Sequence, residues 1–182
     1  MGIQQTPGKV LRYCIEVMAL AADDVVANLG GVLFDRRCLG WDTKVMLHDR
    51  NDIRPLQIIG ADSTDDLQST LDLPQQPHPV AIATSVQLYL TDLRVCARIN
   101  AAIDSRSTEV LLWGDANAMR PNHQMVAVEH RISRAAALFK THALTAATGA
   151  KPSTDLKVEK FLATRAMWQP PHTQLLSTVN TR

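Results

Sequence analysis

Short aliphatic runs alternate with longer amphipathic segments between residues 43 and 147, and this alternation limits the folds open to the chain. Four aliphatic runs predict strands, at residues 43–49, 55–62, 80–84 and 108–115. Three segments with apolar positions at helical spacing predict helices, at residues 63–73, 86–104 and 122–147. We therefore expect an α/β fold, a single layered domain in which a mixed, mainly parallel sheet of about four strands is flanked by amphipathic helices.

The loop between the first two predicted strands, RNDIR at residues 50–54, limits how those strands can pair. Parallel neighbours need a crossover of about a dozen residues. If these two strands are adjacent, they must therefore pair antiparallel, which is why we expect a mixed sheet.

The two ends of the chain add further elements to this alternation. Apolar residues between positions 7 and 22 have helical spacing, but a buried strand over 13–19 fits them as well. Residues 154–168 predict an amphipathic helix that is followed by a polar tail. We therefore divide the chain into an α/β domain, residues 1–148, and a helical C-terminal extension, residues 149–182, that packs on the same domain or extends from it.

Gly30 and Gly31 lie inside a predicted helix that begins near Asp23 or Asp24 and stops at Gly40. A dinucleotide-binding loop has its glycines between a strand and a helix, where backbone amides reach a phosphate. A mid-helix position does not offer those amides, and glycine there costs about 1 kcal/mol relative to alanine. We therefore interpret Gly31, together with Ala27, as a small surface on which another element packs closely.

Three aspartates, Asp49, Asp62 and Asp115, follow predicted strands. Ligands of open α/β sheets bind beyond the carboxyl ends of parallel strands, and carboxylate oxygens suit Mg²⁺. If their strands are parallel, Asp62 and Asp115 share a rim and are the catalytic or metal-binding candidates, with His123 as a candidate general base. Aspartate is also common in loops and at helix caps, so these residues can instead have a purely structural role, and both interpretations stay open.

The charges are spread unevenly although the net charge is +1. Residues 1–119 carry 10 basic and 15 acidic side chains, whereas residues 120–182 carry 9 and 3. The basic C-terminal third predicts contact with a protein partner or with a second copy of the chain. Nucleic acid is an alternative partner, because phosphates attract clustered cations. The partner-binding candidates are Arg131, Arg134, Lys140, Lys157 and Lys160.

The sequence contains neither a Gly-x-Ser-x-Gly elbow nor the motif set of protein kinases. We therefore expect a non-catalytic binding or regulatory module that acts through protein contacts or homo-oligomerisation and needs no cofactor. Two alternatives remain. One is a small Mg²⁺-dependent enzyme that acts on a phosphorylated or nucleotide substrate through the strand-end aspartates, and the other is a nucleic-acid-binding protein.

Three scattered cysteines, Cys14, Cys38 and Cys96, predict reduced core thiols in a cytoplasmic protein. Apolar runs fall short of the about 20 residues that span a membrane. The first residues also lack the basic-then-apolar layout of a signal peptide. We therefore expect a cytoplasmic location and no membrane partner.

Overall fold

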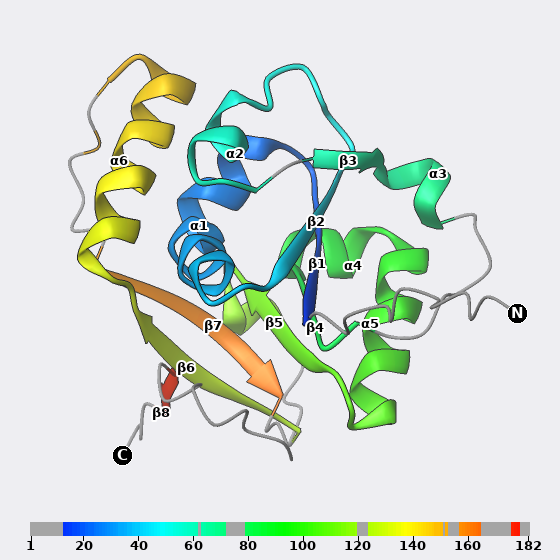
Figure 1. Cartoon of the computed structure of the whole chain (residues 1–182). Helices are drawn as coiled ribbons and strands as arrows, with labels where there is room; N and C mark the ends of the chain where they lie inside the picture. The colour runs from blue at the N-terminus through cyan, green and yellow to red at the C-terminus, as the bar shows by residue number, and fades with distance from the viewer. Residues whose placement is uncertain are drawn as a thin grey trace, which may run out of the picture.

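The computed structural model describes residues 13–61, 63–71, 79–119, 124–150, 152, 157–164 and 176–178, which form one sheet with helices on both faces (Figure 1). The strands are β1 (Cys14–Ala19), β2 (Asp42–Leu47), β3 (Ser63–Asp66), β4 (Ala81–Ser85), β5 (Glu109–Trp113), β6 (Met125–Arg131), β7 (Val158–Thr164) and β8 (Leu176–Thr178). The helices are α1 (Ala22–Cys38), α2 (Arg54–Ile58), α3 (Leu67–Leu71), α4 (Val86–Thr91), α5 (Leu93–Ser105), the 3₁₀ helix η1 (Ala116–Ala118) and α6 (Arg134–Thr148).

The eight strands among the described residues follow the order β3-β2-β1-β4-β5-β7-β6-β8. The first five strands of the chain are mutually parallel. β7 runs antiparallel to both β5 and β6, and β8 runs antiparallel to β6. The predicted α/β fold with a mixed sheet flanked by helices is confirmed, but the sheet is larger than the four strands expected.

Side chains of the strands alternate between two apolar layers, one on each face of the sheet. Val17 of β1 belongs to the layer that includes Leu29 of α1, whereas its neighbour Met18 belongs to the layer that includes Ile99 of α5. Figure 1 shows α1, α2 and α6 on one face and α3, α4 and α5 on the other. Because each buried aliphatic side chain contributes about 1.5–3 kcal/mol, these two layers hold the parallel half of the sheet in place.

The predicted strand over residues 55–62 is wrong, because the structure has the helix α2 there. Pro55 stands in its first turn, where a fixed φ and a missing N–H suit a helix. A short apolar run does not distinguish a buried strand from a buried helix. The next strand is β3, which begins at Ser63 where a helix was expected, and it pairs parallel with β2. The antiparallel pairing expected if the first two runs were adjacent strands does not arise, because the second run is a helix.

The C-terminal helices of the prediction need the largest correction. Residues 122–147 do not form one helix, because β6 precedes α6, and residues 154–168 contain the strand β7. In β7 the buried residues Glu159, Phe161 and Ala163 alternate with less buried ones, which is the period of a strand. The helical C-terminal extension is thus wrong, since β7 lies within the sheet between β5 and β6.

Two other segments can be compared with the expected elements, and one of them agrees. The alternative of a strand over residues 13–19 is confirmed, as β1. The predicted helix 86–104 is divided into α4 and α5 at Asp92, whose carboxylate accepts hydrogen bonds from the N–H groups of Arg94 and Val95 and caps α5. None of the described helices is long and apolar enough to cross a membrane.

Gly31 allows α1 to pack against the segment that joins β6 to α6. A Cβ atom at this position would lie 2.3 Å from Cγ2 of Ile132, a distance that real Cβ atoms do not reach. The interpretation of Gly31 as a close-packing position is therefore confirmed, with Ile132 as the neighbour. Ala27 is exposed and takes no part in that contact.

Candidate functional site

The carboxyl ends of the parallel strands lie along one edge of the sheet, where the sheet also changes its direction of growth. From β1 it extends one way through β2 and β3, and the other way through β4 and β5. This arrangement is the topological switch point at which open α/β sheets bind their ligands. The switch point lies between β1 and β4, so the segment that follows β1 and the carboxyl ends of β4 and its neighbour β5 border it.

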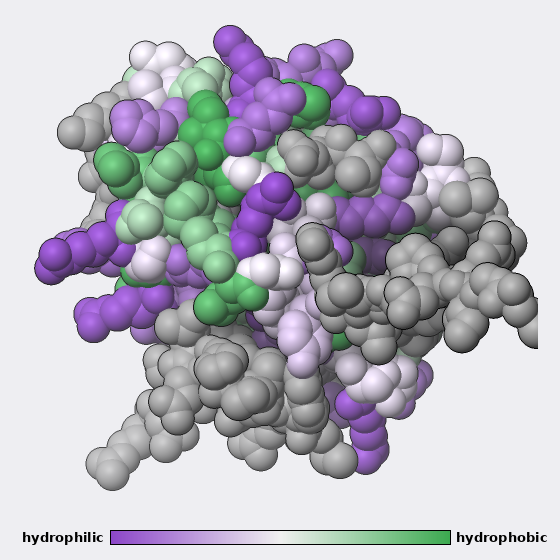
Figure 2. Space-filling model, in the orientation of Figure 1, coloured by the Kyte–Doolittle hydropathy of each residue, from purple (hydrophilic) through white to green (hydrophobic). Residues whose placement is uncertain are grey.

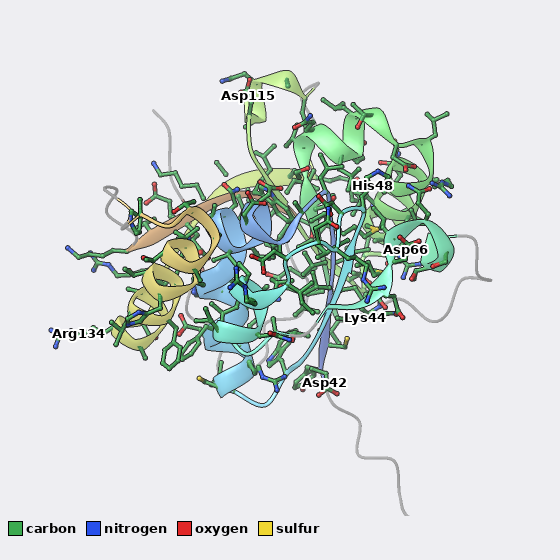
Figure 3. The ribbon with its side chains drawn as sticks, turned by 90° about the horizontal axis from the view of Figure 1, so that it is seen from above. Asp42, Lys44, His48, Asp66, Asp115 and Arg134 are labelled. Carbon is green, nitrogen blue, oxygen red and sulfur yellow. The ribbon has the colours of Figure 1, made fainter. Side chains whose placement is uncertain are left out.

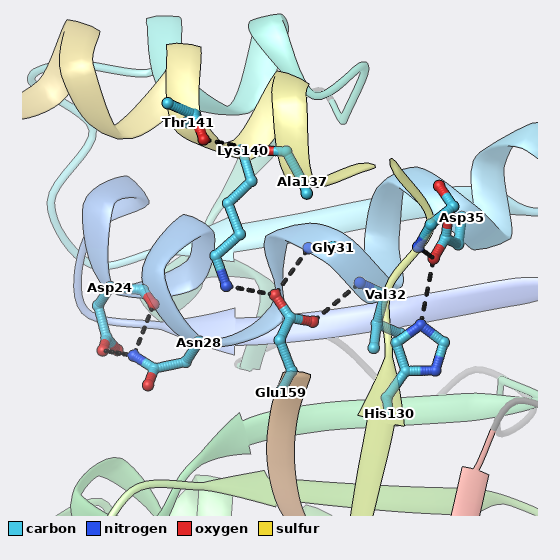
Figure 4. A network of polar contacts seen from close by, with 11 residues as sticks. Asp24, Asn28, Gly31, Val32, Asp35, His130, Ala137, Lys140, Thr141 and Glu159 are labelled. Carbon is cyan, nitrogen blue, oxygen red and sulfur yellow. Dashed lines mark hydrogen bonds and ion pairs between the residues drawn. The ribbon is translucent and has the colours of Figure 1, made fainter. Parts of the chain in front are cut away.

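Asp23 and Asp24 follow β1 directly and occupy the first turn of α1, where the helix dipole favours negative charge. The half-buried Asp24 carboxylate accepts one hydrogen bond on each oxygen. Asn28 Nδ2 donates to Oδ1 at 2.9 Å (Figure 4), and Trp113 Nε1, from the end of β5, donates to Oδ2 at 3.2 Å. Asp23 is exposed, and its Oδ1 accepts the backbone N–H of Asp24.

Burial raises the pKa of the Asp24 carboxyl, and the negative charge of Asp23 raises it further. The hydrogen bonds from Trp113 and Asn28 act in the opposite direction, because they stabilise the ionised form. The net result is a pKa above the ordinary value for aspartate. A carboxyl group of this kind exchanges a proton closer to neutral pH than an exposed aspartate does, which suits general acid–base chemistry.

The aspartates predicted from strand ends have other surroundings. Asp115 is exposed, and its Oδ1 accepts the N–H of Asn117 at the start of η1. Asp49 is also exposed and accepts the N–H of Asn51. Figure 3 places Asp115 on the outer rim of the molecule, and both side chains act locally as turn and cap residues. Asp62 and His123 lie outside the described residues, so a site formed by Asp62, Asp115 and His123 stays a prediction.

The five basic candidates come from different elements, namely β6, α6 and the region of β7. Arg131, Arg134 and Lys157 are exposed, and Lys160, also exposed, pairs with Glu129. Figure 3 shows Arg134 at the outer side of the molecule, far from Asp115. Lys140 needs a correction: it is almost fully buried and pairs with Glu159, so a partner cannot reach it.

Two buried polar contacts fasten α1 to the antiparallel half of the sheet (Figure 4). Glu159 accepts hydrogen bonds from the N–H groups of Gly31 and Val32 at 2.8 and 2.9 Å, and its Oε1 lies 2.5 Å from Lys140 Nζ. Beside this group, Asp35 Oδ2 lies 3.2 Å from His130 Nε2 and accepts the N–H of Ser133. Buried charges in proteins are paired in this way because an unpaired one is costly.

Apolar side chains gather on the surface over α6 and the adjacent part of α1 (Figure 2). Leu138 and Phe139 of α6 are exposed, and the Phe139 ring stacks on Phe34 of α1 with centroids 4.8 Å apart. Exposed apolar surface beside polar residues is typical of protein contact sites. Association with a protein partner or with a second copy of the chain stays a prediction.

Metal binding and thiol chemistry depend on how the His, Cys, Asp and Glu side chains are arranged in the part of the chain that the structure describes. Within that part, no group of three or more His, Cys, Asp or Glu side chains is arranged to hold a metal ion. The prediction that the protein needs no cofactor stays a prediction. The three cysteines are free thiols, but Cys38 is exposed and Cys14 and Cys96 are partly buried, so the expected core location is wrong for Cys38.

Asp24 and Trp113 were not among the predicted site residues. The acidic pair was interpreted as the start of a helix, which is correct for the backbone and incomplete for the side chains. A useful signal was present, because Asp23 and Asp24 follow a run that can form a buried strand. That signal becomes decisive only when residues 14–19 are known to be a strand at the centre of the sheet.

No protein-family model and no curated protein matches the sequence, whereas solved structures match the fold. The A40926 pseudoaglycone deacetylase Dbv21 is 11% identical, with a TM-score of 0.56, over 87% of this chain and 100% of that one. A deacetylase–teicoplanin complex is 10% identical, with a TM-score of 0.56, over 84% and 98%. The conserved protein TT1542 from Thermus thermophilus is 13% identical, with a TM-score of 0.53, over 88% and 98%.

At 10–13% identity these likenesses show the fold. They also contradict the expectation of a non-catalytic binding or regulatory module, because several structural neighbours are deacetylases, which are catalytic proteins. One neighbour is described as the zinc-inhibited form of teicoplanin deacetylase Orf2, which associates metal with that protein. The chain is thus similar in fold to deacetylases, with an acidic pair at the switch point of its sheet.

Proposed function

We propose that the protein is a hydrolase that removes an acyl group from an amine, with Asp24 as the proton-transferring residue and Asp23 beside it. The observation that supports this proposal is the half-buried Asp24 carboxyl, whose pKa is raised, at the carboxyl edge of the sheet. Perturbed carboxyl groups at such edges are candidates for acid–base work. The deacetylase activity named for several structural neighbours supports the choice of reaction.

Hydrolysis of an acyl–nitrogen bond needs a group that accepts a proton from the attacking water and then gives one to the departing nitrogen. In this proposal Asp24 does both in turn. The water oxygen bonds to the acyl carbon, the carbon–nitrogen bond breaks, and the nitrogen leaves as an amine. Each Asp24 oxygen accepts one hydrogen bond from the protein, which leaves a lone pair for the water.

The test is hydrolysis of a panel of N-acylated amines that includes teicoplanin and the A40926 pseudoaglycone, followed by release of free amine. We expect the native chain to release amine and Asp24→Asn to lose about a hundredfold or more of that rate, since general acid–base catalysis contributes about 10²–10⁴-fold. Asp104→Asn is the matched control, because Asp104 is exposed near the end of α5 and away from the acidic pair.

Circular dichroism and thermal unfolding should show that both variants remain folded. The proposal fails if the native chain releases no more amine than a variant in which Asp23 and Asp24 are both asparagine. It also fails if Asp24→Asn and Asp104→Asn have the same rate as the native chain.

A cytoplasmic location also remains part of the proposal. The three free thiols support it, because thiols stay reduced in that compartment. Fractionation of cells that express the tagged full chain tests it, and recovery in a secreted or membrane fraction would contradict it.

A further inference from the structure

Trp113 is the last residue of β5, and its indole ring lies in the apolar layer that includes α1. The residue is almost completely buried. A phenylalanine or leucine would fill such a position without bringing a polar atom into the core. The indole Nε1–H therefore needs a partner, since a buried donor without one is destabilising. Its partner is the Asp24 carboxylate, 89 positions earlier in the sequence.

The contact joins the two sides of the switch point. Asp24 belongs to the first turn of α1, directly after β1, and Trp113 ends β5, on the other side of β4. The next residue, Gly114, has φ +107°, a conformation that favours glycine, so the chain turns away immediately after the indole. The position of the Trp113 ring is therefore set by the sheet.

The other Asp24 oxygen is held from within α1. Asn28 Nδ2 donates to both Oδ1 and the backbone carbonyl of Asp24 at 2.9 Å, one helical turn away. With one donor on each oxygen, the carboxylate plane is fixed by two different elements. Fixed geometry of this kind is what a proton-transferring group needs, because small misplacements slow a reaction strongly.

We infer that Trp113 is a positioning residue for Asp24, and that the hydrolysis proposed above, on which this inference rests, depends on the indole–carboxylate hydrogen bond. Trp113 acts through Asp24 and is not itself a catalytic residue. Loss of the bond releases one carboxylate oxygen and removes a donor that favours the ionised form, so both the orientation and the protonation of Asp24 change.

The first experiment uses the native full chain labelled with ¹³C and ¹⁵N. We expect the indole N–H resonance of Trp113 to shift with pH at the same midpoint as the Asp24 carboxyl carbon, and that transition to disappear in Asp24→Asn. Trp41, buried at the other end of the strands, provides the internal comparison, and its resonance should not follow that midpoint. If the Trp113 resonance does not shift as Asp24 titrates, the inference is overturned, and no tryptophan variant is needed for that conclusion.

The second experiment compares Trp113→Phe with Trp41→Phe, which makes the same substitution away from Asp24. We expect Trp113→Phe to raise the pH midpoint of the Asp24 titration and to move the acidic limb of the kcat/KM profile to higher pH. We also expect it to lower kcat more than it changes KM. Trp41→Phe should leave the midpoint and the limb in place. Turnover with an unchanged pH profile in folded Trp113→Phe would overturn the inference and leave the proposed function supported.

Absence of turnover in every form of the protein has a different meaning. Combined with a shared Asp24–Trp113 titration, it would overturn the proposed function while the positioning of Asp24 by Trp113 would remain supported. The two proposals can therefore fail separately.

Discussion

Replacement of Lys140 by methionine should destabilise the protein strongly, because Lys140 neutralises a buried carboxylate. Its Nζ lies 2.5 Å from Glu159 Oε1, and the two side chains are only 2% and 1% exposed. Removal of one partner from a buried pair leaves an uncompensated charge and costs about 3–5 kcal/mol. Gly31 and Val32 still donate to Glu159, and methionine retains much of the apolar packing. We therefore expect a loss of about 3 kcal/mol, at the lower end of that range.

The assay is equilibrium unfolding in urea, with the free energy of unfolding taken from the midpoint at constant slope. Lys160→Met is the matched control, because Lys160 also pairs with a glutamate, Glu129, at 3.2 Å but its side chain is 77% exposed. Exposed pairs contribute about 0–1 kcal/mol after solvent screening, so this control should shift stability by about 0.5 kcal/mol or less.

A double variant separates the charge from the packing. If an unpaired buried charge causes the loss, Lys140→Met combined with Glu159→Gln should be more stable than Lys140→Met alone, because both charges are then absent. The reasoning is refuted if Lys140→Met unfolds within about 1 kcal/mol of the native chain. It is equally refuted if the double variant shows simple additivity.

Two further predictions concern α1. Gly31→Ala should destabilise the protein by about 1–3 kcal/mol through overpacking. At Gly30 an added Cβ would meet its nearest neighbour at 3.4 Å, so Gly30→Ala should stabilise the protein by up to about 1 kcal/mol. Thermal unfolding in which both variants change stability in the same direction would contradict this prediction. Burial opposes ionisation of Asp35, but hydrogen bonds from His130 and Ser133 outweigh it and hold its pKa below the ordinary value. The stability that Asp35 supplies is therefore complete above the ordinary aspartate pKa and is lost as the pH falls through the lowered value, and Asp35→Asn should flatten that part of the curve of stability against pH.

β2, β4 and β5 could be predicted because they are short runs rich in aliphatic residues, whereas β3, with the polar sequence STDD, was expected as part of a helix. The antiparallel half could not be predicted, because its strands carry buried polar and ionisable side chains at inward positions. Glu159 in β7 and His130 in β6 both interrupt the apolar pattern of a strand. Their burial is possible only beside Lys140 and Asp35, which lie on other elements. Local periodicity does not contain that information, so both strands were interpreted as parts of helices.

The candidate site, too, could be predicted only in part from the sequence. The acidic pair after residues 14–19 was visible in the sequence, and its place in the first turn of α1 was expected. The contact between Asp24 and Trp113 depends on β4 lying between β1 and β5, which is a matter of strand order. Strand order is set by how whole helices and strands pack together, and no short segment determines it.

The place of β7 between β5 and β6 has a consequence for how the chain is assembled. β6 is made before β7, yet it has no direct pairing with β5 and joins the sheet through β7. During synthesis β6 and α6 must therefore wait until residues 158–164 have emerged, while the outer edge of β5 remains unpaired. Pairing over such sequence distances is slow, and an open strand edge invites pairing with other chains. The last steps of folding are thus where the nascent protein is most exposed to aggregation.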